Sequence, residues 1–457
     1  MDTKQLKQKI LDLAIRGKLV PQDPNDEPAS VLLERIRKEK EQLIASGKLK
    51  KSKSKTTDTP HYENVPFEIP DSWEWVTLGT LYNAVSAKRV LQADWKHNGV
   101  PFYRAREIVK LSQDGQVDND LFISEAHYQL LKEAYGIPMP TDIMLSAVGT
   151  IGKTYIVKEE DKFYYKDASV LCLQNLFKLY SEYIQLALCS SIVLSQMFEQ
   201  SKGTTVDTIT IEKVGSYRFP LPPSAEQVRI VAEVNKWFAL IDEIEANKSD
   251  LQKFIQQTKS KVLSLAISGK LVSQDPTDDP AIELLRRINP SFKPCDISHY
   301  ENLPDGWCIC RLEDIVDYEQ PTQYIVESTE YSNDYKTPVL TPGKSFILGY
   351  TNETTGIYDK LPTIIFDDFT TDSRFVDFPF KVKSSAMKIL QVHKEISIRY
   401  VAYFMSITRL AGDTHKRYWI SEYSKIPIPL PPINEQNRIV QTIQDIEAKL
   451  NTITAEL

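Results

Sequence analysis

The chain contains two pairs of repeated blocks, and their order is circularly permuted. Lys9–Ala29 (KILDLAIRGKLVPQDPNDEPA) recurs at Lys261–Ala281 (KVLSLAISGKLVSQDPTDDPA), with 15 of 21 positions identical. Pro220–Val231 (PLPPSAEQVRIV) recurs at Pro429–Val440 (PLPPINEQNRIV), with 9 of 12 positions identical. One block opens the chain, the other closes it, and the two run together in mid-chain. This arrangement predicts a pseudo-twofold structure in which the two chain ends jointly copy the central segment.

Composition sets the broad class of protein. At 457 residues the chain is too long for one hydrophobic core and indicates several domains. It has no apolar run of about 18 residues and no apolar stretch after a basic start, so we expect no membrane segment and a cytoplasmic location. Five cysteines without a CxxC pair and six scattered histidines indicate neither disulfides nor a structural metal. The net charge of −7 is an objection to nucleic-acid binding but leaves the question open.

The segment Ala225–Ser268 contains neither Pro nor Gly and predicts one long helix. Its apolar residues recur in alternating steps of four and three, which is the pattern of a helix that supercoils with a partner. A helix of this length is a rod of roughly 65 Å. The seam consists of Ile230, Val234, Trp237, Ile241, Ile244, Leu251, Ile255, Val262 and Leu265.

The two chain ends supply the partner that this helix needs. The C-terminal stretch repeats the apolar stripe from Ile439 to Leu457, and the N-terminal stretch carries it at Leu6, Ile10 and Leu13. We expect an antiparallel pair related by a pseudo-twofold axis, with Met1 and Leu457 within about 8 Å of each other along the helix direction. The alternative is two unrelated amphipathic helices in separate cores.

A polar link, GKLVxQDPxDxPA, follows each copy of the first block and leads into a shorter helix. We expect these shorter helices at Ala29–Ala45 and Ala281–Ile288. The lysine-rich stretch Lys38–Lys55 predicts a flexible tether, with contact to DNA phosphates as the alternative.

Two domains are inserted between the repeats, at His61–Leu221 and Cys295–Leu430. Both open with HYEN and PDxW, and both have a Gly (Gly203, Gly412) 17 residues before the PLPP block, but their interiors do not match in sequence. The runs VPFYRA, DIMLSAVGT, KTYIVKE, TPVLTPG and TIIFDDF predict strands, and Ser181–Gln200 and Ile398–Leu410 predict helices.

The fold class is therefore α+β, with two α/β domains separated by a pair of long antiparallel coiled-coil-like helices. We expect an N-terminal helical segment and linker (1–60), a first inserted domain (61–221), a central long-helix region (222–294), a second inserted domain (295–430) and a C-terminal helix (431–457).

No catalytic constellation emerges. Ala147–Thr154 (AVGTIGKT) differs by one residue from a phosphate-binding loop, but the residues after it predict strands where that loop needs a helix, so we expect a turn. The chain has no [ND]PP[YF] motif and no GxGxxG loop. Paired carboxylates such as Asp367 and Asp368 are more often turn or surface residues than acid/base pairs.

Basic and aromatic residues interleave in both inserted domains. Such side chains pair with phosphates and guanine edges, although strand residues at alternate positions can instead point into the core. The candidate DNA contacts are Lys88, Arg89, Arg104, Arg106, Lys153, Lys202, Thr204 and Thr205 in the first domain, and Lys344, Tyr350, Arg374, Lys416, Arg417 and Tyr418 in the second.

With the repeats in place, the whole chain resembles the specificity subunit of type I restriction–modification enzymes. The resemblance rests on the two PLPPxxEQxxIV blocks, the paired LAIxGKLVxQDP segments, and the phrases DIMLSAVGTIGK and KGTTVDTIT. The second domain departs from it, since GDTHKRYW stands where the first has GTTVDTIT.

The resemblance implies that each inserted domain reads one half of a bipartite target in double-stranded DNA. It implies two modification subunits on the helices, which methylate adenine with S-adenosylmethionine, and motor–nuclease (restriction) subunits that use ATP and Mg. No cofactor is expected in this noncatalytic chain. The alternatives are a coiled-coil scaffold whose domains bind proteins or glycans, and a free-standing enzyme.

Overall fold

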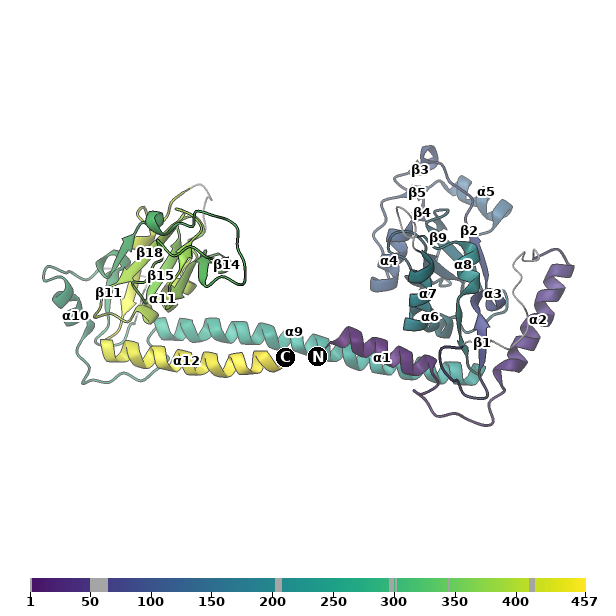
Figure 1. The fold of residues 1–457 in the computed structure, drawn as a ribbon, viewed down its shortest axis with the longest axis horizontal. Coiled ribbons are helices and arrows are strands. Elements are labelled where there is room, and N and C mark those ends of the chain that lie inside the picture. Colours follow the sequence, from purple (N-terminus) through teal and green to yellow (C-terminus); the bar gives the residue numbers. More distant parts are fainter. Residues whose placement is uncertain are drawn as a thin grey trace. The chain divides into compact units, whose positions relative to one another are not determined.

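The computed structural model describes residues 2–49, 65–201, 208–295, 300, 302–343, 345–410 and 416–457 (Figure 1). The chain divides into two compact units, Met1–Ala246 and Asn247–Leu457. The division falls inside the central helix, so the finer five-part domain division stays a prediction.

The long central helix is α9 (Ser224–Ile267). The other helices of the first unit are α1 (Thr3–Ile15), α2 (Ala29–Ala45), α3 (Leu78–Leu81), α4 (Ala105–Asp114), α5 (Glu125–Tyr135), α6 (Ser181–Cys189), α7 (Ser191–Ser201), α8 (Ile211–Ser216) and the 3-10 turn η1 (Gln92–Asp94). Its strands are β1 (Glu74–Thr77), β2 (Asn83–Ser86), β3 (Trp95–Lys96), β4 (Val100–Tyr103), β5 (Phe122–Ile123), β6 (Ile143–Ser146), β7 (Thr154–Ile156), β8 (Tyr164–Tyr165), β9 (Val170–Gln174) and β10 (Arg218–Leu221).

The second unit is built from fewer helices and a similar set of strands. Its helices are α10 (Ala281–Ile288), α11 (Ile398–Ile407) and α12 (Ile433–Glu456), with the 3-10 turns η2 (Leu312–Asp314), η3 (Pro321–Tyr324) and η4 (Tyr423–Lys425). Its strands are β11 (Cys308–Arg311), β12 (Val316–Glu319), β13 (Thr337–Leu340), β14 (Ile347–Thr351), β15 (Thr363–Asp367), β16 (Ser373–Val376), β17 (Lys381–Val382), β18 (Met387–Val392) and β19 (Pro427–Leu430).

The predicted helices and strands are confirmed. The shorter helices after the links have the predicted bounds, and each predicted strand run contains a strand: β4, β6, β7, β13 and β15. The predicted helix Ser181–Gln200 is two helices, α6 and α7. Of the lysine-rich stretch predicted as a tether, residues 38–45 belong to α2, and residues 50–55 lie outside the described part.

The inserted domains share one strand order, although their interior sequences do not match. The main sheet of the first has the order β2-β9-β6-β7, and that of the second has the order β12-β18-β15-β16, both antiparallel throughout. In the smaller sheets, β4 pairs antiparallel with β5 and parallel with β8, as β13 pairs with β14 and β17. The domains thus have one framework, and the elements between corresponding strands differ.

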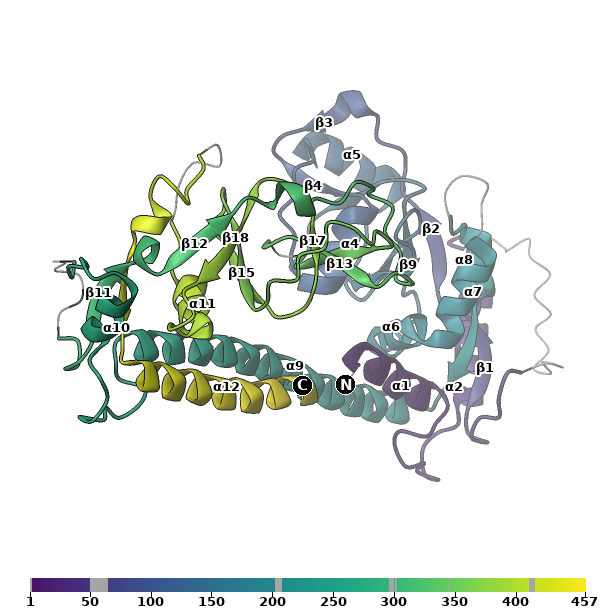
Figure 2. The ribbon, with the colours of Figure 1, turned by 60° about the vertical axis from the view of Figure 1, so that its left-hand side comes forward.

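Within each unit, part of α9 pairs antiparallel with a terminal helix, α1 in the first unit and α12 in the second (Figures 1 and 2). Lys7 of α1 forms an ion pair with Asp242. At the repeat-equivalent positions of the second unit, Lys259 donates to Asn451 Oδ1 at 2.8 Å. The repeated sequence thus gives a repeated helix–helix contact, as the circular permutation predicts.

The expected seam on α9 is only half buried. Seam residues separated by seven or fourteen positions, such as Val234, Ile241 and Ile255, are buried. The alternate seam residues Trp237 and Ile244 are 42% and 46% exposed, so the prediction that they face the partner helix is wrong. A single partner covers one stripe of an α-helix, and the second apolar stripe of α9 lies beside that contact.

Within the second unit, the last residue of the chain contacts α9. The Lys248 amine donates to the backbone carbonyl of Leu457, and these two residues are equivalent under the repeat. The predicted proximity of Met1 to Leu457 stays a prediction because Met1 lies outside the described residues.

Each unit contains the same buried joint, which explains why the repeated blocks keep their sequences. In the first unit, the Glu226 carboxylate accepts hydrogen bonds from Trp73 Nε1 at 2.9 Å and Gln22 Nε2 at 2.7 Å. Burial raises the pKa of Glu226 against these hydrogen bonds. Arg229 pairs with Asp26 at 2.5 Å beside it. The joint ties the polar link and the PDxW segment to the start of α9.

In the second unit the joint is repeated around Glu435. Its carboxylate accepts from Trp307 Nε1 at 3.1 Å and Gln274 Nε2 at 3.0 Å, and burial raises its pKa as well. Arg438 pairs with Asp278 at 2.8 Å. The same five groups recur with similar contacts, which gives a packing role to four residues of each pair of repeated blocks.

We expect Glu226→Gln to lower the free energy of unfolding by about 1–3 kcal/mol. An NH2 group replaces one carboxylate oxygen and cannot accept a hydrogen bond, so one donor of the joint loses its partner. Chemical denaturation of the full chain measures the change. Glu243→Gln, at an exposed position of α9, is the matched control. Equal small effects of both substitutions would contradict the assigned role of the joint.

Candidate nucleic-acid interface

In the first domain, one candidate lies on the turn between β6 and β7. Lys153 is exposed at the end of this turn, and its backbone N–H donates to Ser146 Oγ at 2.9 Å. Gly149 and Gly152 adopt φ of 76° and 81°, which favours glycine, and build a tight turn. Thr208 forms a β-bridge with Val148 of the same turn.

The predicted contacts Lys88 and Arg89 follow β2 and are both exposed. The Lys88 amine lies 5.3 Å from the centre of the Tyr135 ring, and its backbone N–H donates to the Tyr164 hydroxyl at 3.0 Å. The turn that carries this basic pair is thus fixed by a buried tyrosine.

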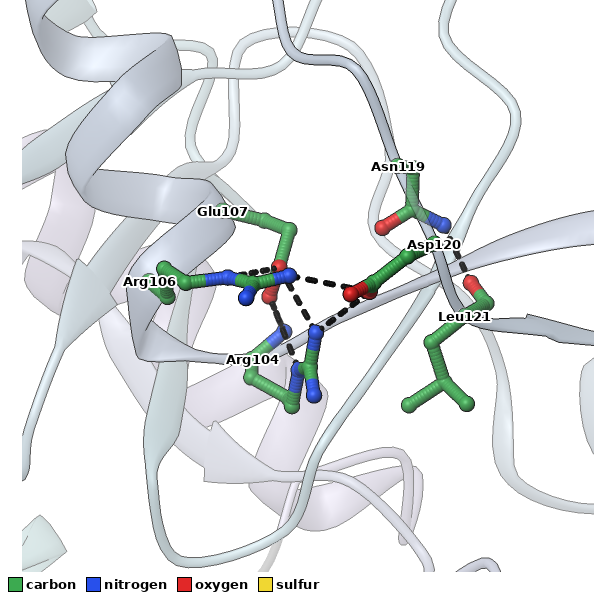
Figure 3. A network of polar contacts seen from close by, with 6 residues as sticks. All are labelled: Arg104, Arg106, Glu107, Asn119, Asp120 and Leu121. Carbon is green, nitrogen blue, oxygen red and sulfur yellow. Dashed lines mark hydrogen bonds and ion pairs between the residues drawn. The ribbon is translucent and has the colours of Figure 1, made fainter.

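Arg104 and Arg106 form one network with Glu107 and Asp120 (Figure 3). The guanidinium of Arg104 donates to Glu107 at 3.0 and 3.2 Å, and that of Arg106 at 2.8 Å. Both also donate to Asp120 Oδ1, at 2.6 Å from Arg104 and 2.9 Å from Arg106. These contacts, led by the hydrogen bond from Arg106, lower the pKa of Asp120. Contact of the two arginines with DNA stays a prediction.

In the second domain, Arg374 is exposed on β16, and Lys416 and Arg417 are exposed before the last strand. Lys416 pairs with Glu422. Tyr418 differs: its side chain is 4% exposed, packed in the hydrophobic core. The prediction that Tyr418 contacts DNA is therefore corrected, because its ring has no open face for a base.

The segment around Tyr418 has the same backbone position as its counterpart in the first domain, although the sequences differ. Tyr418 N–H donates to the Asp368 carbonyl at 2.8 Å, and Ile209 N–H donates to the Ala147 carbonyl at 2.9 Å. Ala147 and Asp368 follow the corresponding strands β6 and β15. Ile209 and Tyr418 thus bind equivalent strand ends, although the sequences around them differ.

In the second domain, a buried ion pair holds this segment. Asp368 lies 3.3 Å from the Lys388 amine, and both side chains are 2% exposed. The other carboxylate oxygen of Asp368 accepts from Trp419 N–H at 2.8 Å. Its neighbour Asp367 caps a turn by accepting from Phe369 N–H at 2.9 Å, as expected of a turn residue.

Tyr350 is half-buried on β14 and lines a shallow hollow of about 420 Å³. Lys336, Ile347 and Phe378 line the same hollow. The remaining candidates, Lys202, Thr204, Thr205 and Lys344, lie outside the described residues.

Sequence reasoning missed the acidic partners of the arginines and the Asp368–Lys388 pair. Asp120 lies 16 residues from Arg104, and no motif joins them. The signal that could have found it is the register of β4 with β5, since the Leu121 carbonyl accepts from Phe102 N–H at 2.9 Å.

The loop that resembles a phosphate-binding motif and the candidate metal-ligating side chains were the remaining possible sites of chemistry. Ala147–Thr154 is the expected turn and leads into β7. Across the described ranges, no cluster of three or more His, Cys, Asp or Glu side chains could hold a metal ion. In the same ranges, no helix is long and apolar enough to cross a bilayer.

Comparison with known sequences gives a consistent set of relatives. The model of the type I restriction modification DNA specificity domain matches residues 70–252 and 304–457. The chain is 47% identical over 175 residues to the EcoR124I/EcoR124II specificity subunit of Escherichia coli, covering 35% of this chain and 43% of that protein. It is 29% identical over 376 residues to the EcoEI specificity subunit of Escherichia coli, covering 68% and 62%. Each match spans less than two thirds of the relative's length.

Solved structures show the same fold. A chain from a type I restriction–modification system aligns with a TM-score of 0.63 at 16% identity, covering 86% of this chain and 94% of that one. The HsdS subunit from Thermoanaerobacter tengcongensis aligns with a TM-score of 0.50 at 15% identity, covering 86% and 93%. Since the family model covers more than half of the sequence, the chain belongs to the family of type I restriction–modification specificity subunits.

Proposed function

We propose that this chain is the noncatalytic, sequence-specific DNA-binding subunit of a type I restriction–modification complex. Each inserted domain would read one half of a bipartite target. The observation that carries this proposal is the shared strand order of the two domains, combined with different segments between the strands. One framework with two different sets of connecting segments favours two different half-sites, and therefore an asymmetric target.

The chemistry would belong to partner subunits. Two modification subunits would bind the helices and methylate adenine with S-adenosylmethionine, and restriction subunits would cleave DNA with ATP and Mg in the cytoplasm. The solved relative with the TM-score of 0.63 comes from a type I system that assembles into a complex, which supports such partners. This chain would contribute recognition and the surfaces on which the partners assemble.

The second apolar stripe of α9 supports a docking surface on the helices. In the first unit, Trp237, Leu240 and Ile244 are 42–46% exposed and lie three and four residues apart, which places them on one face. We define these three residues as the α9 docking face. Tryptophan is one of the residues enriched in protein–protein hot spots, and the two aliphatic neighbours extend the apolar surface around it. A modification subunit is the occupant we assign to this face.

The proposal predicts salt-dependent binding of duplex DNA by the full chain together with its modification subunits. The logarithm of the affinity should fall linearly with the logarithm of salt concentration, by about 0.9 per neutralised phosphate. Arg417→Gln should reduce this slope by about one if the exposed guanidinium contacts a phosphate. Fluorescence anisotropy with labelled mixed-sequence and target duplexes measures both quantities.

Lys293→Gln is the control, since it removes an exposed positive charge of the second unit outside the candidate set. Its slope should equal that of the unmodified chain. Absence of salt-dependent binding by the complex would refute the proposal and favour a scaffold that binds proteins or glycans.

A further inference from the structure

We propose that Asp120 occupies the place of a DNA phosphate between Arg104 and Arg106 and is displaced from both arginines when DNA binds. The inference rests on the proposed function and adds an intramolecular competitor to it. Figure 3 shows the four side chains as one cluster.

The geometry around Asp120 is that of an anion site. A single oxygen, Oδ1, accepts from Nη2 of Arg104 at 2.6 Å and from Nη2 of Arg106 at 2.9 Å. Guanidinium groups bind phosphate oxygens and carboxylate oxygens through the same N–H donors. A phosphate oxygen at the position of Oδ1 would therefore find both donors already in place.

The two carboxylates of the cluster differ in how firmly they are held. Glu107 is fully buried beneath the guanidinium groups, whereas the side chain of Asp120 is 64% exposed. Breaking a buried ion pair by removing one partner is strongly destabilising, but an exposed ion pair contributes little. Glu107 thus holds the arginines in position, and Asp120 is the partner that an incoming anion can replace.

The backbone keeps the arginines aimed at this position when Asp120 leaves. Arg104 follows β4 directly, and its own backbone N–H donates to Glu107 at 2.8 Å, which closes the first turn of α4. Arg106 lies in that first turn. The two guanidinium groups are therefore positioned by Glu107 and α4 independently of Asp120.

Charge favours a phosphate over a neutral base edge as the replacement. With two arginines and two carboxylates the cluster is neutral, and displacement of Asp120 leaves one uncompensated positive charge beside Glu107. A phosphate restores that balance, while a base edge does not. The contact should accordingly strengthen binding to all duplexes rather than select one sequence.

The test is the affinity of the full chain, with its modification subunits, for a mixed-sequence duplex and a target duplex over a range of salt concentrations. Asp120→Asn keeps the shape of the side chain and removes its charge. We expect about 3- to 10-fold tighter binding to both duplexes at low salt, with a gain that shrinks as salt rises. Asp120→Glu retains the charge, so this variant should bind DNA like the unmodified chain.

Two further variants make the result specific. Asp118→Asn removes an equal charge from the same loop, and the Asp118 side chain takes part in none of the ion pairs or hydrogen bonds found in the described residues, so it should change affinity little. Adding Arg106→Gln to Asp120→Asn should abolish the gain. A thermal unfolding curve for each variant reports whether the domain stays folded.

The outcomes separate this inference from the proposed function. Unchanged or weaker DNA binding by a folded Asp120→Asn variant overturns the inference, as does an equal gain from Asp118→Asn. A gain confined to the target duplex would assign the arginines to a base edge and also overturn it. If the unmodified complex itself shows no salt-dependent DNA binding, the proposed function fails instead.

Discussion

Replacing Trp237 with Asp should weaken binding of a modification subunit by about 30- to 1,000-fold. Loss of a central interface tryptophan typically costs about 2–4 kcal/mol, and a factor of ten corresponds to about 1.4 kcal/mol. The new carboxylate would also be desolvated against an apolar partner, which adds to the loss. Titration of the full chain with the modification subunit, followed by calorimetry or sedimentation, gives the affinity and the stoichiometry.

The matched control for this prediction is Asn235→Asp, which adds the same charge two residues away at another exposed position of α9. It should leave the affinity nearly unchanged, and both variants should unfold at the temperature of the unmodified chain. Equal binding by the Trp237 variant and the unmodified chain would show that the α9 docking face does not bind the modification subunit.

The helices could be predicted because their signals are local. Neither Pro nor Gly interrupts Ala225–Ser268, and α9 has nearly those bounds. What periodicity could not tell is which apolar residues face a partner. Val234 and Trp237 belong to the same heptad pattern, yet Val234 is buried and Trp237 is exposed, because one partner helix covers only one stripe.

The strand order that the inserted domains share could not be predicted, although their matching edges indicate related frameworks. The strands are short, and strand pairing depends on contacts between residues far apart in the chain. Met144 pairs with Cys172, and Ile365 pairs with Ile389, at equivalent places in two sheets whose sequences do not align. Burial selects for apolar character here rather than for particular residues, so the fold is retained while the sequence changes.

The candidate site could be predicted in part. Lys153, Arg374 and Arg417 are exposed, as a DNA contact must be. Tyr418 looked equally suitable in the sequence, but its aromatic ring fills the core beside Trp419. The role of Asp120 could not be predicted, because only the pairing of β4 with β5 brings it close to Arg104 and Arg106.

Whether each inserted domain reads one half-site can be tested by exchanging residues 61–221 for the corresponding segment of another specificity subunit. The incoming segment should retain the PDxW motif, because Trp73 forms the buried joint with Glu226. Methylated adenines would then be mapped genome-wide in cells that carry the exchanged chain and its modification subunits. One half of the methylated sequence should change, while the other half and the spacing stay the same. A change in both halves, or in neither, would contradict the assignment of one half-site to each domain.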